Sequence, residues 1–161
     1  MIRYDQPARV LLHRLKYAGD TTVLPGLARI IEEAPISEVP GSGFIIPVPL
    51  HRRKLQERGL NQSLLLSRLL FPSRLQDIRA DLLKRVRDTP AQTSLGGEAR
   101  RKNLRSAFQV AGSGELVGRS VCLVDDVLTT GATVYECSRI LLSMGATEVH
   151  VFTLARVIPA L

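Results

Sequence analysis

The chain has no tryptophan, only three tyrosines and four phenylalanines, and only two cysteines among its 161 residues. Two cysteines are too few for a disulfide framework or a zinc ribbon, and Cys122 and Cys137 lie in segments where cysteine packs as a small hydrophobic residue. Three scattered histidines predict no metal cluster. No apolar run reaches the length of a membrane span, and the first residues lack the apolar core of a secretory signal. We therefore expect a cytoplasmic protein with an aliphatic core.

Positive charge is concentrated in the middle of the chain. The net charge is +7, and residues 52–105 contain fourteen Lys or Arg against five Asp or Glu. The rest of the chain has eight basic and ten acidic residues. Such a segment predicts a polyanionic partner, either a pyrophosphate group or nucleic acid. A basic surface without a partner is the alternative.

Strand patterns alternate with helix patterns along the whole chain. The length indicates a single domain over 1–161 without an N-terminal zinc ribbon. Helices are expected over 7–17, from a cap at Thr21 or Thr22 to Ile31, and over 61–71, 98–106 and 132–144. Strands are expected over 44–48, 80–86, 108–111, 121–124 and 148–155, with turns over 51–54 and 88–97. Residues 80–86 also fit a helix, and the basic loop after them favours a strand. The alternation predicts an α/β fold, a parallel sheet with helices on both faces.

The most informative segment is 121–133, in which a buried strand runs into two acids and then a loop of small residues before a helix. Ligands of open α/β sheets bind outside the carboxyl ends of the strands. Backbone N–H groups and hydroxyls of the loop suit a phosphate, and Asp125 and Asp126 suit ribose hydroxyls or a bridging Mg²⁺. The site is therefore predicted to bind a phosphorylated sugar.

Other interpretations of this segment are possible. An Asp-Asp pair at a strand end is often only a helix cap or turn. A Walker phosphate loop is excluded because no lysine follows Gly131. A response-regulator receiver also has a strand that ends in two aspartates, but residues 133–161 are too short for its remaining strands and helices.

The order of four hydrophobic residues, two acids, two hydrophobic residues and Thr-Thr-Gly-Ala-Thr resembles the phosphoribosyl-pyrophosphate (PRPP) signature of type I phosphoribosyltransferases. The resemblance implies that Asp125 and Asp126 hold the ribose hydroxyls. It also implies a 5-phosphate cradle formed by Thr129, Thr130, Gly131, Ala132 and Thr133. Purine-type relatives carry an acidic acid/base residue at the position of Thr129, so the resemblance does not favour a purine acceptor.

Two basic segments complete the resemblance. After the strand over 44–48, Arg52 and Arg53 stand where the family contacts pyrophosphate, and arginine binds phosphate oxygens bidentately. A solvated charged turn is the other interpretation. Residues 85–108 correspond to a flexible flap that would exclude water from the ribosyl centre, with a hinge at Gly96-Gly97. Arg100, Arg101 and Lys102 are the flap cations that can reach the phosphates, and Arg101 is the one we assign.

Several ordered motifs make the chain similar to the ComF family, which is linked to DNA uptake. They are Leu15-Lys16-Tyr17-Ala18-Gly19-Asp20, Pro47-Val48-Pro49-Leu50, Arg58-Gly59-Leu60-Asn61-Gln62, Thr89 with Gln92, and Arg101 with Asn103-Leu104 and Ala107-Phe108. Many ComF proteins begin with a four-cysteine zinc ribbon, which this sequence lacks.

The resemblance implies a PRPP-binding phosphoribosyltransferase that needs Mg²⁺, which would be bound through PRPP and water beside Asp125 and Asp126. Arg52, Arg53 and Arg101 would stabilise the leaving pyrophosphate. The alternative is a non-catalytic binding protein that acts in DNA uptake or regulation through its basic surface, with DNA or competence proteins as partners. The acceptor and the oligomeric state are not predicted.

Overall fold

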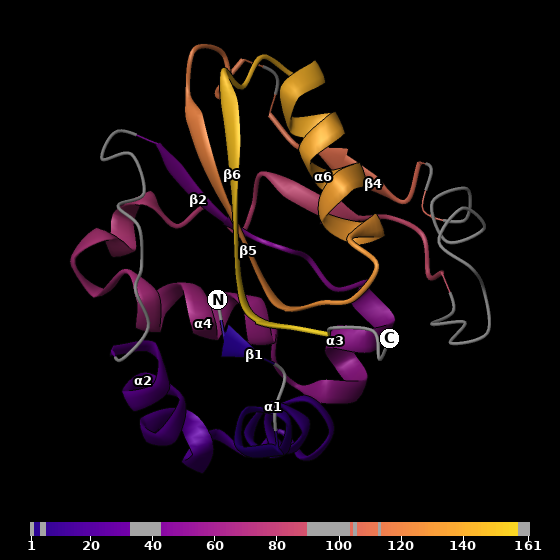
Figure 1. Cartoon of the computed structure of the whole chain (residues 1–161). Coiled ribbons are helices and arrows are strands. Elements are labelled where there is room, and N and C mark those ends of the chain that lie inside the picture. The colour runs from indigo at the N-terminus through magenta and orange to yellow at the C-terminus, as the bar shows by residue number, and fades with distance from the viewer. Residues whose placement is uncertain are drawn as a thin grey trace.

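Four parallel strands form the central sheet, in the spatial order β1-β6-β5-β2 (Figure 1). The structure is a computed structural model that describes residues 2–3, 6–32, 43–89, 104, 106–112 and 114–157. The sheet strands are β1 (Ile2–Arg3), β2 (Phe44–Pro47), β5 (Ser120–Leu128) and β6 (Glu148–Arg156). A separate antiparallel pair contains β3 (Leu83–Arg85) and β4 (Phe108–Val110). The predicted parallel sheet is confirmed, and β1 is an addition that the sequence patterns did not indicate.

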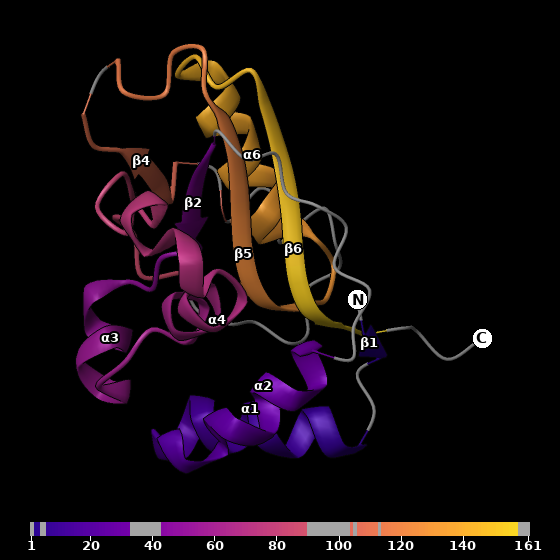
Figure 2. The same ribbon diagram turned by 90° about the vertical axis from the view of Figure 1, so that its left-hand side faces the viewer.

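Helices cover both faces of the sheet, as predicted (Figure 2). The helices are α1 (Gln6–Ala18), α2 (Leu24–Glu32), α3 (Arg52–Arg58), α4 (Gln62–Leu70) and α6 (Ala132–Ser143), with short 3₁₀ helices η1 (Thr21–Val23) and η2 (Pro72–Asp77). Successive side chains of a strand point to opposite faces. In β5, Val121 and Leu123 pack with α6 and the β3-β4 pair, whereas Cys122 and Val124 pack with α1, α2 and α4. Cys122 and Cys137 are both buried and free.

Two helix starts differ from the prediction, and in each a side chain caps the helix at a residue that the sequence patterns did not indicate. Asp20, not Thr21 or Thr22, caps the second helical segment, since its carboxylate accepts from the Thr22 N–H at 3.0 Å. The predicted turn over 51–54 is wrong, because residues 52–58 form α3. The His51 ring caps that helix, and Gly59 ends it in the left-handed conformation at φ 72°.

The predicted signature strand is longer than expected: β5 continues to Leu128, because β6 pairs with it as far as the Leu128–Arg156 register. Gly131 then takes a left-handed φ of 75° and starts α6, and Gly145 follows the end of that helix at φ 99°. A strand, a turn and a helix thus follow one another as the sequence indicated, with the two aspartates inside the strand.

Some predictions fall on residues outside the described ranges. They include most of the turn over 88–97 and nearly all of the helix expected over 98–106. None of the helices in the described ranges is long and apolar enough to cross a membrane.

Candidate functional site

The two acids of the signature lie in the part of β5 that extends beyond the end of its neighbour β2. The register of β2 against β5 ends at Pro47 opposite Val124, followed by one bond from Val48 N–H to the Val124 carbonyl at 2.8 Å. Beyond that point the carboxylates bond to the backbone of their own strand. Asp125 Oδ1 accepts from the Asp126 N–H and Asp126 Oδ1 accepts from the Val127 N–H, both at 2.9 Å. Each carboxylate therefore satisfies one backbone N–H of β5 beyond the end of β2.

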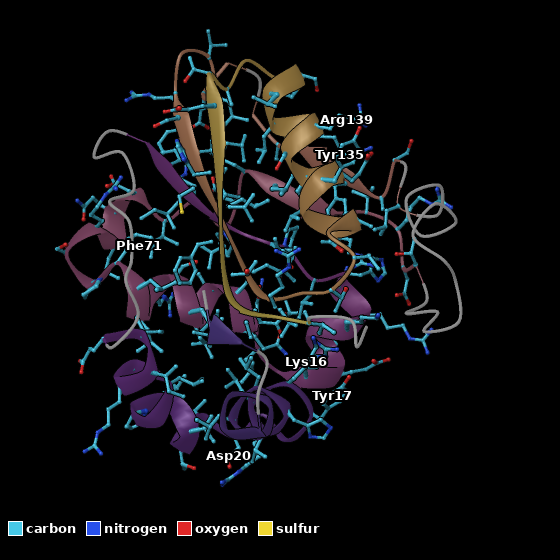
Figure 3. All side chains as sticks on the ribbon, viewed as in Figure 1. Lys16, Tyr17, Asp20, Phe71, Tyr135 and Arg139 are labelled. Carbon is cyan, nitrogen blue, oxygen red and sulfur yellow. The ribbon has the colours of Figure 1, made fainter. Side chains whose placement is uncertain are left out.

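Asp126 forms an ion pair with a residue 110 positions away. It is 6% exposed, and its Oδ2 lies 3.1 Å from Nζ of Lys16 on α1. Lys16 extends from α1 toward the carboxyl end of the sheet (Figure 3). A buried carboxylate needs a partner of opposite charge, and Lys16 supplies it. The pair also ties α1, near the N-terminus, to the acids of β5.

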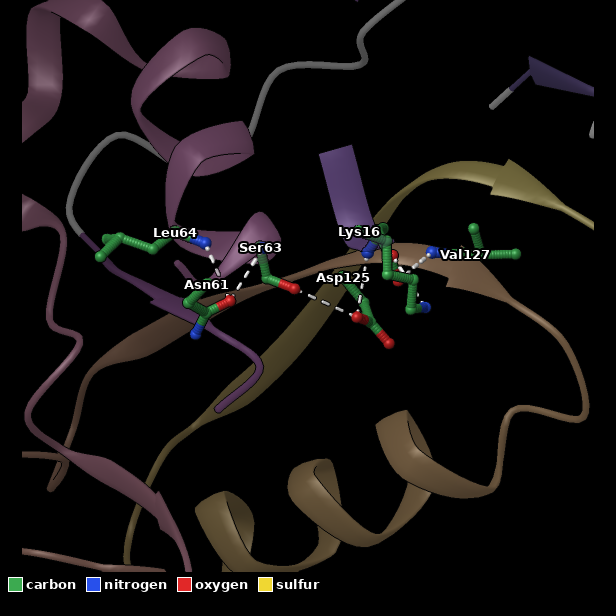
Figure 4. A network of polar contacts seen from close by, with 7 residues as sticks. Lys16, Asn61, Ser63, Leu64, Asp125 and Val127 are labelled. Atoms are coloured by element: carbon green, nitrogen blue, oxygen red, sulfur yellow. Dashed lines mark hydrogen bonds and ion pairs between the residues drawn. The ribbon is translucent and has the colours of Figure 1, made fainter. Parts of the chain in front are cut away.

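Asp125 is held differently. Its Oδ1 accepts from the Ser63 hydroxyl at 3.2 Å, at the start of α4 (Figure 4). Burial, together with the negative charge of Asp126, raises the pKa of Asp125 to about 7. The two neighbouring carboxyl groups are thus in unlike environments: Asp126 is paired with a cation, and Asp125 is near the point of ionisation at neutral pH.

Asn61 positions Ser63 and the loop after β2 together. Its side-chain oxygen accepts from the N–H groups of Ser63 and Leu64 at 2.9 and 3.4 Å, which caps α4. Its amide nitrogen donates to the Val48 carbonyl at 3.2 Å. One side chain therefore links the start of α4 to the loop that was predicted to contact pyrophosphate.

The predicted phosphate cradle lies between β5 and α6. Thr129 and Thr130 are exposed, Thr133 is half-buried, and Ala132 is buried at the first turn of the helix. No side chain caps the amino end of α6, which begins after Gly131. The N–H groups of the first turn of a helix need acceptors, and the helix dipole favours an anion there. The first turn of α6 therefore offers N–H donors at the end of the segment that begins with the two acids.

The cations predicted to contact pyrophosphate lie on the outer face of α3. Arg52 and Arg53 are both exposed, and Arg53 is occupied by carboxylates. Its guanidinium lies 3.0 Å from Glu57 and 3.7 Å from Asp88. Arg101 falls outside the described residues. The assignment of these three arginines stays a prediction.

A second set of cations is more deeply placed: Lys54 and Arg58 on one face of α3, and Arg85 at the end of β3. Burial and then the charge of Arg85 lower the pKa of Lys54. Burial is also the main cause that lowers the pKa of Arg85, and the charge of Arg58 adds to it. Asp88 partly offsets this repulsion at both Lys54 and Arg85, and a bound anion would offset it further.

Arg85 has an unfilled hydrogen-bonding group. Its Nη2 donates to the Thr89 hydroxyl at 2.5 Å, and its guanidinium lies 5.5 Å from the centre of the Phe108 ring. Its Nε is fully buried and has no hydrogen-bond partner among the described residues. Asp125 lies near enough to raise the pKa of Arg85 by its charge. Arg85 therefore has a buried donor and lies within range of the charge of Asp125.

Sequence comparison identifies the family. Competence protein F of Haemophilus influenzae is 38% identical to this chain over 161 residues, which cover 95% of this chain and 69% of that protein. The chain belongs to the ComF family. The DNA utilization protein YhgH of Escherichia coli O157:H7 is 34% identical over 158 residues, with 95% of this chain and 69% of that protein covered. The ComFC protein of Bacillus subtilis is 29% identical, with 95% and 61% covered. No protein-family model matches.

Solved phosphoribosyltransferase structures resemble this ComF chain more distantly. Orotate phosphoribosyltransferase of Aeropyrum pernix aligns over 94% of this chain and 93% of its own, with a TM-score of 0.47 and 18% identity. A hypoxanthine phosphoribosyltransferase of Staphylococcus aureus aligns over 91% and 62%, with a TM-score of 0.40 and 15% identity. Both TM-scores are below 0.5, so the fold assignment depends on the observed strand order and on the family.

Sequence reasoning did not assign three residues that the structure relates to these acids: Lys16 and Ser63 contact them, and Arg85 lies within range of the charge of Asp125. Lys16 belongs to the Leu15–Asp20 motif of the ComF resemblance, and Ser63 follows the Asn61-Gln62 motif. Those motifs were the sequence signals for Lys16 and Ser63, but neither motif indicates the role of these residues in the site. Arg85 had only the general signal of the basic segment.

Proposed function

We propose that this ComF-family chain binds PRPP with Mg²⁺ and transfers the phosphoribosyl group to an acceptor, releasing pyrophosphate. The observation that carries the proposal is the juxtaposition of the acid pair with the uncapped start of α6, because ribose hydroxyls and a 5-phosphate are separated by only a few bonds. Asp125 and Asp126 would accept from the ribose hydroxyls. The loop over 129–133 would bind the 5-phosphate.

The proposed reaction breaks the bond between ribose C1 and a pyrophosphate oxygen, and pyrophosphate leaves with the electron pair. The acceptor nucleophile forms the new bond to C1 and loses its proton. Lys54, Arg58 and Arg85 are the cations that we assign to the negative charge of the leaving group. Mg²⁺ would add charge stabilisation of the pyrophosphate, and the oxygen-rich acid pair fits a hard cation bound through substrate and water.

Calorimetry of PRPP binding tests the proposal directly. We expect Mg²⁺-dependent binding of PRPP in the micromolar range, and weaker binding of ribose 5-phosphate, which lacks the pyrophosphate. Equal affinities for PRPP and ribose 5-phosphate would argue against the pyrophosphate subsite. An absence of PRPP binding would contradict the whole assignment.

Replacement of Arg85 separates the two sets of cations. For Arg85→Met we expect the affinity for PRPP to fall by roughly 10-fold or more, since a charge-assisted hydrogen bond contributes about 1.5–3 kcal/mol. The affinity for ribose 5-phosphate should not change. The matched control is Arg53→Met, whose guanidinium is exposed and already paired. If Arg53→Met lowers the affinity for PRPP and Arg85→Met does not, the exposed cations Arg52 and Arg53 are the better candidates for pyrophosphate contact.

DNA binding is a second candidate function, favoured by the charge of residues 52–105 and by relatives whose names refer to competence and DNA utilization. Contacts with several phosphates make affinity fall steeply with salt. We expect binding of a labelled single-stranded oligonucleotide to weaken by roughly 10-fold or more between 50 and 200 mM salt. Undetectable binding at 50 mM would exclude this function, and fluorescence polarisation provides the measurement.

A further inference from the structure

A groove of about 550 Å³ lies between α3, α4 and the segment that leads into β3. The leucine side chains of its lining come from residues 50–65 and from β3. They are Leu50, Leu55, Leu60, Leu64, Leu65 and Leu83. Leu55 is 42% exposed, and α3 buries none of its own side chains. Apolar surface of this kind marks a binding site.

Cations line the same groove, and acids do not. Arg52, Arg68, Lys84 and Arg85 contribute to it, and no aspartate or glutamate is among the described residues that line it. Arg52, Arg68 and Lys84 form no ion pair with another residue in the described part of the chain. The site therefore combines an aliphatic wall with unpaired positive charge, and a complementary ligand carries aliphatic groups and negative charge.

A second copy of the chain does not satisfy this requirement. A two-fold symmetric contact would bring the four cations of each copy into one interface, where the described lining of the groove supplies no carboxylate to pair with them. Like charges at an interface are strongly unfavourable. The groove is thus unsuited to a symmetric dimer.

Nucleic acid satisfies only half of the requirement. Single strands bind through phosphates and through bases stacked on aromatic rings. No aromatic side chain is found among the lining residues in the described part of the chain, so bound nucleic acid would leave the leucines without a partner. Aliphatic side chains of an amphipathic peptide fill such grooves, and carboxylates beside them would meet the cations.

We propose that the groove binds a segment of a partner protein that presents aliphatic side chains flanked by aspartate or glutamate. The proposal does not require PRPP binding, although Arg85 is shared with the proposed pyrophosphate subsite. Arg52, which the sequence suggested for pyrophosphate, would here contact the carboxylates of the partner.

The test is selection from a random 12-residue peptide library displayed on phage, with the purified wild-type chain as bait. We expect enriched peptides to combine aliphatic residues with at least two carboxylates. Their affinity should fall at least tenfold for Leu55→Glu, and it should not change for Leu75→Glu. Leu75 is a matched control because it lies in η2, outside the groove, and is 53% exposed. Thermal melting of both variants checks folding.

Three results would overturn the proposal. One is the absence of any enriched peptide. Another is a set of enriched peptides that lack acidic residues, or whose affinity is the same for wild type and Leu55→Glu. The third uses a 12-nucleotide oligothymidylate as a competitor: displacement of the selected peptide, together with oligonucleotide binding that Leu55→Glu weakens tenfold, would make the groove a nucleic-acid site.

Discussion

Asp126→Asn should lower the affinity for PRPP by about 10- to 100-fold in the presence of Mg²⁺, as measured by calorimetry. The asparagine keeps the shape of the side chain, and its oxygen can still accept from the Val127 N–H. It loses the charge that strengthens hydrogen bonds from ribose hydroxyls, which contribute about 1.5–3 kcal/mol when the acceptor is ionised. An affinity within threefold of wild type would rule out this carboxylate as a ribose ligand.

Two controls separate binding from folding. Glu148→Gln removes an exposed carboxylate at the first residue of β6, at the opposite end of the sheet, and should leave PRPP affinity unchanged. Asp126→Asn also leaves Lys16 without its ion-pair partner, which destabilises the fold by itself.

The double variant Lys16→Met/Asp126→Asn removes that unpaired cation. We expect the double variant to regain thermal stability relative to Asp126→Asn, because coupled residues in one ion pair are non-additive. We do not expect it to regain PRPP affinity, because the carboxylate is still missing. Recovery of both properties would mean that Asp126 acts only through the ion pair.

The signature segment could be predicted from local sequence, and its surroundings could not. The strand, the turn and α6 follow one another within a few residues, so hydrophobic pattern and turn chemistry were sufficient. The extra length of β5 comes from pairing with β6, which is a non-local interaction. β1 has two residues and depends on pairing with residues 155–156, so no local pattern could indicate it.

The missed helix α3 has a different cause. It begins with three cations and buries none of its side chains, so it lacks the apolar stripe that identifies a helix in sequence. The burial of the cations at the start of α3 could not be predicted either, because it depends on tertiary contacts. Arg52, Arg53 and Lys54 are neighbours in sequence, but only the structure separates the exposed pair from the partly buried lysine that lies near Arg85.

The environment of Asp125 predicts a dependence of stability on pH that is opposite to that of most carboxylates. Burial and the charge of Asp126 raise the pKa of Asp125 to about 7 in the folded chain, against about 3.9 in the unfolded chain. Between these values the folded state holds a proton that the unfolded state has released. The free energy of unfolding therefore falls as pH rises from about 4 to about 7, and it falls no further above that range.

Asp125→Asn should remove this pH-dependent loss, since its oxygen can still accept from Ser63 and the Asp126 N–H. At pH 8 we expect the variant to be more stable than wild type by on the order of 2–4 kcal/mol, at about 1.4 kcal/mol per pH unit. The gain should vanish near pH 4, as measured by urea unfolding. The control Asp81→Asn should show the opposite sign, because the hydrogen bond from Arg79 lowers the pKa of Asp81. If the free energies of unfolding of wild type and Asp125→Asn change in parallel from pH 4 to 8, the pKa of Asp125 is not raised in the folded chain. If Asp125→Asn is more stable and also binds PRPP more weakly, the strain at this carboxyl group is a cost of binding function.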